Sequence, residues 1–312
     1  MILLSLISMA LAHHDAPPSR LPTVGAAGDW DADSGSVRVD VGADLVRFRQ
    51  VKSGWGRVDT VPGVVRFTQV ATVAVRHRSG LEASVALPWV TSLASKRQTT
   101  GVGDAMFAAG WSGGDRVRGQ VRALLTAPTG RSGAGDDIAL IGVHAKDGSL
   151  MVMTTTTQTL PGLGVAAAGI GGGIATTRGR VEWSASGQWL VPLAERSDSI
   201  RWGMDVGAQT ALGVQIGRFQ PQIAGVVQAH SADRIAGPDA SLWTANARVE
   251  AALDLSLKAD VSKIVRCQVG AQIPMARWVH GTQVVGSSQG RVACSLRPRK
   301  AKADAVPSAA RD

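Results

Sequence analysis

The chain has no tyrosine, two cysteines and little lysine, and beyond its first residues it has no long apolar run. Without a stretch of about twenty apolar residues, a protein that crosses a membrane with helices is excluded. No cysteine or histidine lies at metal-ligand spacing, which argues against a zinc site. Gly-x-Ser-x-Gly and His-Glu-x-x-His motifs are also missing. We therefore expect no enzyme, no metal and no cofactor.

The scarcity of lysine means that arginine supplies most of the net charge of +9. The arginines are spread singly along the chain, whereas nucleic-acid surfaces gather Lys and Arg into patches interleaved with stacking aromatics. A nucleic-acid partner is therefore not expected. The guanidinium is always charged and forks onto carboxylates, which suits paired or pore-lining positions.

The ends of the chain differ in composition from its middle. Residues 2–12 form a short apolar run that closes on Ala10-Leu11-Ala12, the small-x-small pattern of a secretory cleavage site. We expect a signal peptide at 1–12, with a buried first strand as the alternative. A polar lead at 13–36 and a basic, disordered tail at 297–312 leave 37–296 as one domain.

Within 37–296, apolar and polar residues alternate with period two. Between Val265 and Ile273, for example, Val and Ala fall on one face while Arg and Gln fall on the other. Twelve such segments are predicted as strands, at 37–48, 64–77, 81–90, 103–112, 116–127, 165–177, 180–191, 200–213, 217–230, 243–257, 261–274 and 286–296. A further hairpin within 128–164, at about 138–145 and 150–157, would raise the number to fourteen.

The connections between these strands alternate between tight turns and long loops. The tight turns fall at 78–80, 113–115, 178–179, 213–216 and 258–260. An up-and-down barrel in a membrane gives this pattern when its two rims face different compartments. The fold class is therefore predicted as all-β, an up-and-down antiparallel transmembrane β-barrel of about twelve strands.

Tryptophan marks the ends of several predicted strands, as expected of rings that lodge at membrane interfaces. The predicted membrane-interface aromatics are Trp89, Trp111, Trp183, Trp189, Trp202 and Trp243. A soluble barrel would bury such rings near the strand middles.

Charged residues share the strand face opposite the apolar positions. An Arg or Lys at the lipid midplane costs about 2–4 kcal/mol, so a membrane barrel turns charges inward. The predicted pore-lining residues are Arg38, Arg66, Arg76, Arg116, Arg118, Arg122, Glu182, Arg201, Asp205, Arg218, Arg248, Glu250, Arg266 and Arg291. Rings of Arg favour anions in a pore; structural ion-pair ladders are the alternative.

The two cysteines, Cys267 and Cys294, fall opposite each other if the last hairpin turns near His280. In an oxidising compartment they can form a cross-strand disulfide. Two free thiols that face lipid are the alternative.

Several short motifs carry a family resemblance. They are Gly101-Val102-Gly103-Asp104, Pro128-Thr129-Gly130, Pro161-Gly162-Leu163-Gly164, and Gln272-Ile273-Pro274-Met275-Ala276-Arg277 leading to Gly281-Thr282-Gln283. In their order and placement they resemble the outer-membrane transporter family associated with the meta-pathway of phenol degradation, which is distantly akin to the long-chain fatty-acid channels. The resemblance implies a single outer-membrane barrel that admits small, often hydrophobic or aromatic compounds.

The expected function is that of a channel or transporter in the cell outer membrane, for passive uptake or efflux of a small organic solute. Its expected partners are the lipid bilayer, the solute and the outer-membrane insertion machinery. The alternative is a secreted or periplasmic soluble β-barrel that acts as a binding or structural module.

Overall fold

The structure, a computed structural model, describes residues 36–94, 97–130, 140–144, 150–154, 164–194, 200–235, 244–245 and 247–296. The segments predicted as a signal peptide, a polar lead (up to residue 35) and a basic tail lie outside these ranges. The regular elements within them are β1 (Ser36–Gly54), β2 (Gly56–Arg76), β3 (Leu81–Ala94), β4 (Arg97–Val102), β5 (Ala105–Gly113), β6 (Val117–Ala127), β7 (Leu140–His144), β8 (Leu150–Thr154), β9 (Ala167–Arg178), β10 (Val181–Pro192), β11 (Ile200–Arg201), β12 (Asp205–Val214), β13 (Phe219–His230), β14 (Asp233–Ile235), β15 (Thr244–Ala245), β16 (Arg248–Asp260) and β17 (Val265–Leu296). No helix among the described residues is long and apolar enough to span a membrane.

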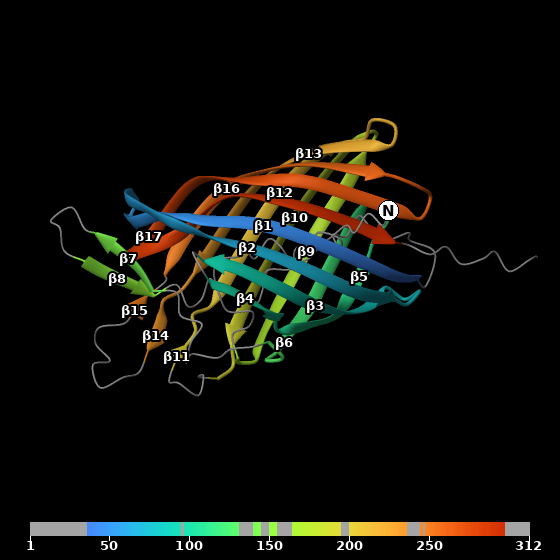
Figure 1. The fold of residues 1–312 in the computed structure, drawn as a ribbon. Coiled ribbons are helices and arrows are strands. Elements are labelled where there is room, and N and C mark those ends of the chain that lie inside the picture. The colour runs from blue at the N-terminus through green and yellow to red at the C-terminus, as the bar shows by residue number, and fades with distance from the viewer. Residues whose placement is uncertain are drawn as a thin grey trace, which may run out of the picture.

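The main sheet has twelve antiparallel strands and closes on itself (Figure 1). Strand β1 pairs with β2 along one side and with the second half of β17 along the other. The first half of β17 pairs with β16, so that β17 is a single long hairpin. Strands β4 and β5 both pair with β3, end to end. The prediction of an all-β, up-and-down barrel with twelve strands is confirmed.

The hairpin expected within 128–164 exists, but it does not join the barrel. Strands β7 and β8 pair only with each other, and β11, β14 and β15 form a separate small sheet. The predicted strands 200–213 and 243–257 therefore begin too early, because barrel pairing starts at Asp205 and Arg248. Both small sheets lie toward one end of the barrel (Figure 1).

Three segments expected as long loops are instead continuations of barrel strands. Pairing of β1 with β2 runs as far as Ser53 opposite Gly56, and β3 continues into its pairing with β4. Residues 275–285 lie within β17. These stretches lack a regular alternation of apolar and polar residues, but strand pairing requires only backbone donors and acceptors. The alternation therefore underestimates the strand lengths.

The five tight turns lie at one end of the barrel, here called the short-turn rim, and the opposite end is the long-loop rim. The barrel's first residue, Ser36, pairs with Arg76 beside the first of these turns, and Leu296 pairs with Val39 nearby. Gly80 has a φ of 87°, a backbone conformation that glycine adopts without steric cost. Both ends of the barrel chain thus meet at the short-turn rim.

The two faces of the wall differ as the sequence predicts. Along β13, Phe219, Ile223 and Val227 point outward and are exposed, while Gln220 and Gln228 point inward and are buried. The interior, expected to be polar throughout, nevertheless has an apolar layer. It consists of Val70, Ala86, Met106, Leu124, Ala167 and Leu190. Inward positions on β2, β3, β5, β6, β9 and β10 therefore carry aliphatic side chains, and those on β2, β3, β6 and β10 carry charges as well.

Candidate pore lining

Most of the predicted pore-lining residues occupy inward positions on the barrel wall. They are Arg38, Arg66, Arg76, Arg118, Arg122, Glu182, Asp205, Arg248, Glu250, Arg266 and Arg291. Period-two alternation along paired strands turns them to the same side as the buried polar residues.

Three of the predicted residues do not lie on the wall. Arg116 and Arg218 are exposed in tight turns, because β6 begins at Val117 and β13 at Phe219. Arg201 is exposed in β11, which belongs to the small sheet. The prediction for these three residues is corrected, because the alternation was extended past the true strand ends.

Glu82 is the centre of a hydrogen-bond network over β3, β5 and β6. Its Oε2 accepts a hydrogen bond of 3.1 Å from the Ser112 hydroxyl. Its Oε1 accepts hydrogen bonds from Gln120 Nε2 and from Arg122 Nε. One buried carboxylate is thereby satisfied by three donors, and the buried guanidinium of Arg122 has its counter-charge.

The opposite wall, formed by β1, β16 and β17, is also held by ion pairs. Arg277 pairs with Glu250, and Arg291 Nη2 lies 2.5 Å from Asp254 Oδ1. Arg38 Nε donates to an aspartate two residues along β1, at 2.8 Å. The inward guanidiniums of Arg38, Arg277 and Arg291 are thus compensated by carboxylates, which agrees with the ion-pair ladders considered as the alternative.

Arg277 was missed by the sequence reasoning because of a bulge in β17. The register against β16 shifts between Ala251 and Ala252, where Met275 protrudes with 69% of its surface exposed. A bulge inserts one extra residue and reverses which positions face inward. Arg277 is therefore inward. It was missed from the sequence because the predicted strand ended at residue 274.

One row of inward residues combines polar side chains with glycines. Following the strand registers, it reads Glu82, Gly110, Arg122, Gly171, Gln188, Gly207, Gln228, Glu250 and Arg277. Gln188 is 7% exposed, and neither its amide nitrogen nor its amide oxygen has a hydrogen-bond partner within the described structure. A buried carboxamide without partners costs about 1–3 kcal/mol, so this position favours water or a polar solute in the lumen.

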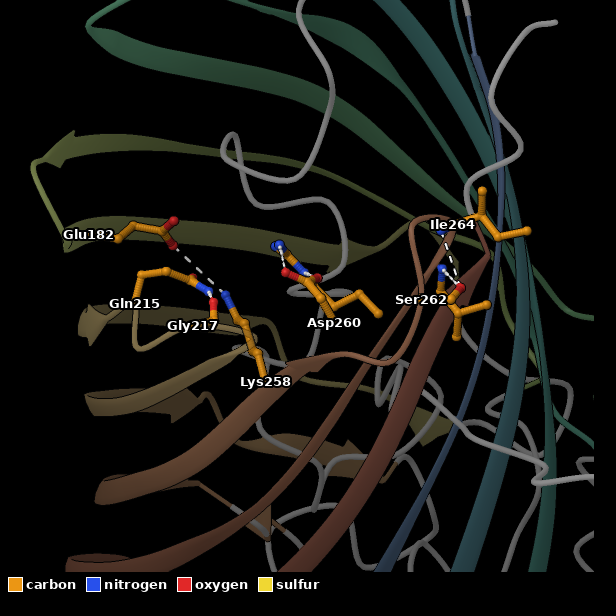
Figure 2. A network of polar contacts seen from close by, with 9 residues as sticks. Glu182, Gln215, Gly217, Lys258, Asp260, Ser262 and Ile264 are labelled. Atoms are coloured by element: carbon orange, nitrogen blue, oxygen red, sulfur yellow. Dashed lines mark hydrogen bonds and ion pairs between the residues drawn. The ribbon is translucent and has the colours of Figure 1, made fainter.

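The mouth at the short-turn rim is crossed by a long ion pair, shown in Figure 2. Lys258 Nζ on β16 lies 3.8 Å from Glu182 Oε1 on β10, with β12 and β13 between these strands. A Cβ on Gly213, opposite Glu182 on β12, would lie 3.0 Å from the Gln220 amide. The missing side chain leaves room for the Gln220 amide. Sequence reasoning had placed Lys258 in a turn, whereas it lies on β16.

Four predicted interface tryptophans point outward and are exposed, namely Trp89, Trp111, Trp183 and Trp189. Trp202 differs, because it is 6% exposed and packs against Val165. It also lines a cavity of about 230 Å³ at the long-loop rim, together with Arg201. Trp243 lies outside the described residues.

The cysteines Cys267 and Cys294 are joined by a disulfide across the last hairpin, with their Cα atoms 4.0 Å apart. The alternative of two free thiols is therefore not realised here. Both residues occupy outward positions on β17, and the bond ties the half that pairs with β16 to the half that pairs with β1.

His230 Nδ1 lies 2.9 Å from Asp205 Oδ1, and both residues face the lumen near the long-loop rim. The neighbouring Ser231 hydroxyl accepts a hydrogen bond from the Met204 backbone and so helps to hold the start of β12. Within the described residues, no group of three or more His, Cys, Asp or Glu side chains is placed to hold a metal ion.

Comparison with solved structures identifies barrels of similar architecture. The COG4313 outer membrane channel from Pseudomonas putida F1 has a TM-score of 0.67 at 13% identity, over 87% of this chain and 98% of that chain. The KdgM porin has a TM-score of 0.41 at 6% identity, over 82% of this chain and 99% of that one. A Pseudomonas aeruginosa FadL homologue has a TM-score of 0.37 at 8% identity, over 95% and 98% of the two chains.

Neither a family model nor a curated protein sequence matches this chain. At 13% identity, the similarity to the COG4313 channel is one of fold. The closed twelve-stranded barrel of this chain therefore resembles an outer membrane channel in fold, along nearly the whole of that channel's length.

Proposed function

We propose that this protein is an outer-membrane channel that passes a small organic solute without an energy source. The segregation of its two faces supports the proposal most strongly. Outward positions are filled by exposed aliphatic and aromatic side chains, whereas buried charges occupy the interior. Contiguous apolar surface of this extent marks a membrane or protein interface, since soluble monomers rarely expose it.

The same observation counts against the soluble barrel that acts as a binding or structural module. Such a barrel would leave Leu87, Val121 and Ile170 in water on three separate strands, each about half exposed. In a bilayer the same side chains contact acyl chains, and the inward Arg122 and Arg277 avoid a cost of about 2–4 kcal/mol each.

The lumen favours a solute with both polar and apolar parts. Gln188 offers an unpaired carboxamide, and Leu190, two residues further along β10, belongs to the apolar layer. The resemblance to the phenol meta-pathway transporters favours a hydrophobic or aromatic compound. The proposal includes cleavage of residues 1–12 on export and assembly by the outer-membrane insertion machinery.

The ion selectivity of the open channel tests this function. Arg118 is inward on β6, and its Nη2 donates to Thr177 Oγ1 at 3.3 Å. We expect Arg118→Glu to move the reversal potential in planar bilayers toward cation preference, because rings of charge set selectivity. Arg116→Glu is the matched control, since it makes the same charge change in an exposed turn two residues away. Equal shifts in both variants, or none in either, would contradict a lumen formed by this face.

A further inference from the structure

The short-turn rim carries a cation in every one of its five tight turns. These residues are Arg78, Arg116, Arg178, Arg180, Arg218 and Lys263, and all six are exposed. We call this set the basic collar. None of its members forms an ion pair with another described residue, whereas the inward Arg122, Arg277 and Arg291 are each paired with a carboxylate. In these turns Asp115 is the one exposed carboxylate that has no such partner among the described residues.

The backbone fixes the collar in place. The carbonyls of Arg116, Arg180 and Arg218 accept hydrogen bonds from Thr176 Oγ1, Gln215 N and Asp260 N, respectively, each on a neighbouring segment. These distances are 3.0, 2.7 and 2.8 Å. The cations therefore project from short, anchored turns at one level of the barrel.

Exposed apolar residues adjoin the collar directly. Val117, Val181, Phe219 and Ile264 each follow a collar residue in the sequence and are exposed, and the first three occupy outward strand positions. The indole nitrogen of Trp111 donates to the Ser79 carbonyl at 3.1 Å, so this outward ring lies against the first turn. Cations beside apolar and aromatic residues mark the level at which lipid headgroups meet acyl chains.

We propose that the basic collar binds the phosphate groups of anionic phospholipids in the membrane leaflet at the short-turn rim. This inference rests on the proposed function, because it requires the barrel to lie in a bilayer. A Lys or Arg near an anionic membrane surface contributes about 1 kcal/mol, and the guanidinium forks onto phosphate oxygens. Because no ion pair with another described residue occupies the collar, those donors are available to lipid.

Lipid selectivity of the reconstituted full-length protein tests the proposal. Electron spin resonance with spin-labelled lipids measures the association constant of phosphatidylglycerol relative to phosphatidylcholine. We expect the wild type to prefer phosphatidylglycerol about two- to fivefold at low salt, where 1 kcal/mol corresponds to about fivefold. Replacing all six collar residues by Gln should reduce the ratio to about one, and 1 M salt should do the same by screening.

The matched control replaces the five collar arginines by Lys and so keeps the charge. Preference in the wild type and the Lys variant, with loss in the Gln variant, supports the proposal. A wild type without preference, or a Gln variant that retains it, overturns the proposal. Channel conductance in neutral bilayers separates the two hypotheses. If the protein conducts but shows no lipid preference, only the lipid-binding role of the collar is rejected. If the protein inserts but never conducts, the channel function is rejected.

Discussion

At the scale of single residues, Glu82 is the carboxylate that connects three neighbouring strands of the lumen wall by hydrogen bonds. It satisfies donors from Ser112, Gln120 and Arg122, and these residues bring three strands to one carboxylate. Breaking a buried pair by removing one partner leaves an uncompensated charge, which is far more costly than losing an exposed pair.

We therefore predict that Glu82→Gln destabilises the folded barrel by about 3–5 kcal/mol, as expected when a buried guanidinium loses its counter-charge. Urea unfolding in phospholipid vesicles measures this change. Glu182→Gln is the control, because the distance of 3.8 Å to Lys258 is the longest among the lumen ion pairs described here. If both variants lost the same free energy of unfolding, the hydrogen-bond network around Glu82 would contribute no more to stability than the long ion pair of Glu182.

At the scale of single elements, β17 is the strand in which sequence reasoning and structure differ most. The alternation around Val269 correctly predicted which face of the first half is apolar. It could not predict the protruding Met275 or the inward Arg277, because a bulge leaves no period of its own in the sequence. Whether Cys267 and Cys294 are bonded depends on strand register, which the pattern alone does not fix.

The disulfide in this hairpin should contribute to stability and not to transport. It closes a sequence separation of 27 residues, for which the chain-entropy model gives about 2–4 kcal/mol. We expect a reductant to lower the urea midpoint of the wild type, while the Cys267→Ala/Cys294→Ala variant stays insensitive to it. Single-channel conductance should be the same in both states, since the two sulfurs lie on the outward face. A conductance that changes on reduction would contradict this prediction, because it would mean that the disulfide affects the conducting path.

Two lysines lie at or near the turn between β16 and β17, and we expect them to affect conductance differently. Lys258 reaches across the lumen mouth to Glu182 (Figure 2), while Lys263 is exposed in the turn itself. Lys258→Ala should raise single-channel conductance, to the order of twofold, because it removes both the side chain and the ion pair from the mouth. Lys263→Ala removes the same charge outside the lumen and should leave conductance nearly unchanged. Similar effects of the two substitutions would refute a constriction at Lys258.

At the scale of the whole molecule, two separate signals in the sequence agree on the barrel. Period two located the walls, and the alternation of tight turns with longer connections gave their up-and-down order. The apolar layer around Met106 and Leu124 was not anticipated. Whether inward aliphatic residues on neighbouring strands lie at the same level depends on the strand registers. The period-two alternation does not give these registers.

The account depends on the outward face lying in lipid, and a pair of substitutions on β6 tests this most directly. Val117 and Val121 share that face and are 57% and 58% exposed, but Val121 lies farther from the turn, by about 13 Å at strand rise. Urea unfolding in phosphatidylcholine vesicles should show that Val121→Arg costs about 2–4 kcal/mol and Val117→Arg about 0–1 kcal/mol. Small and equal costs at both positions would place this face in water and contradict the account.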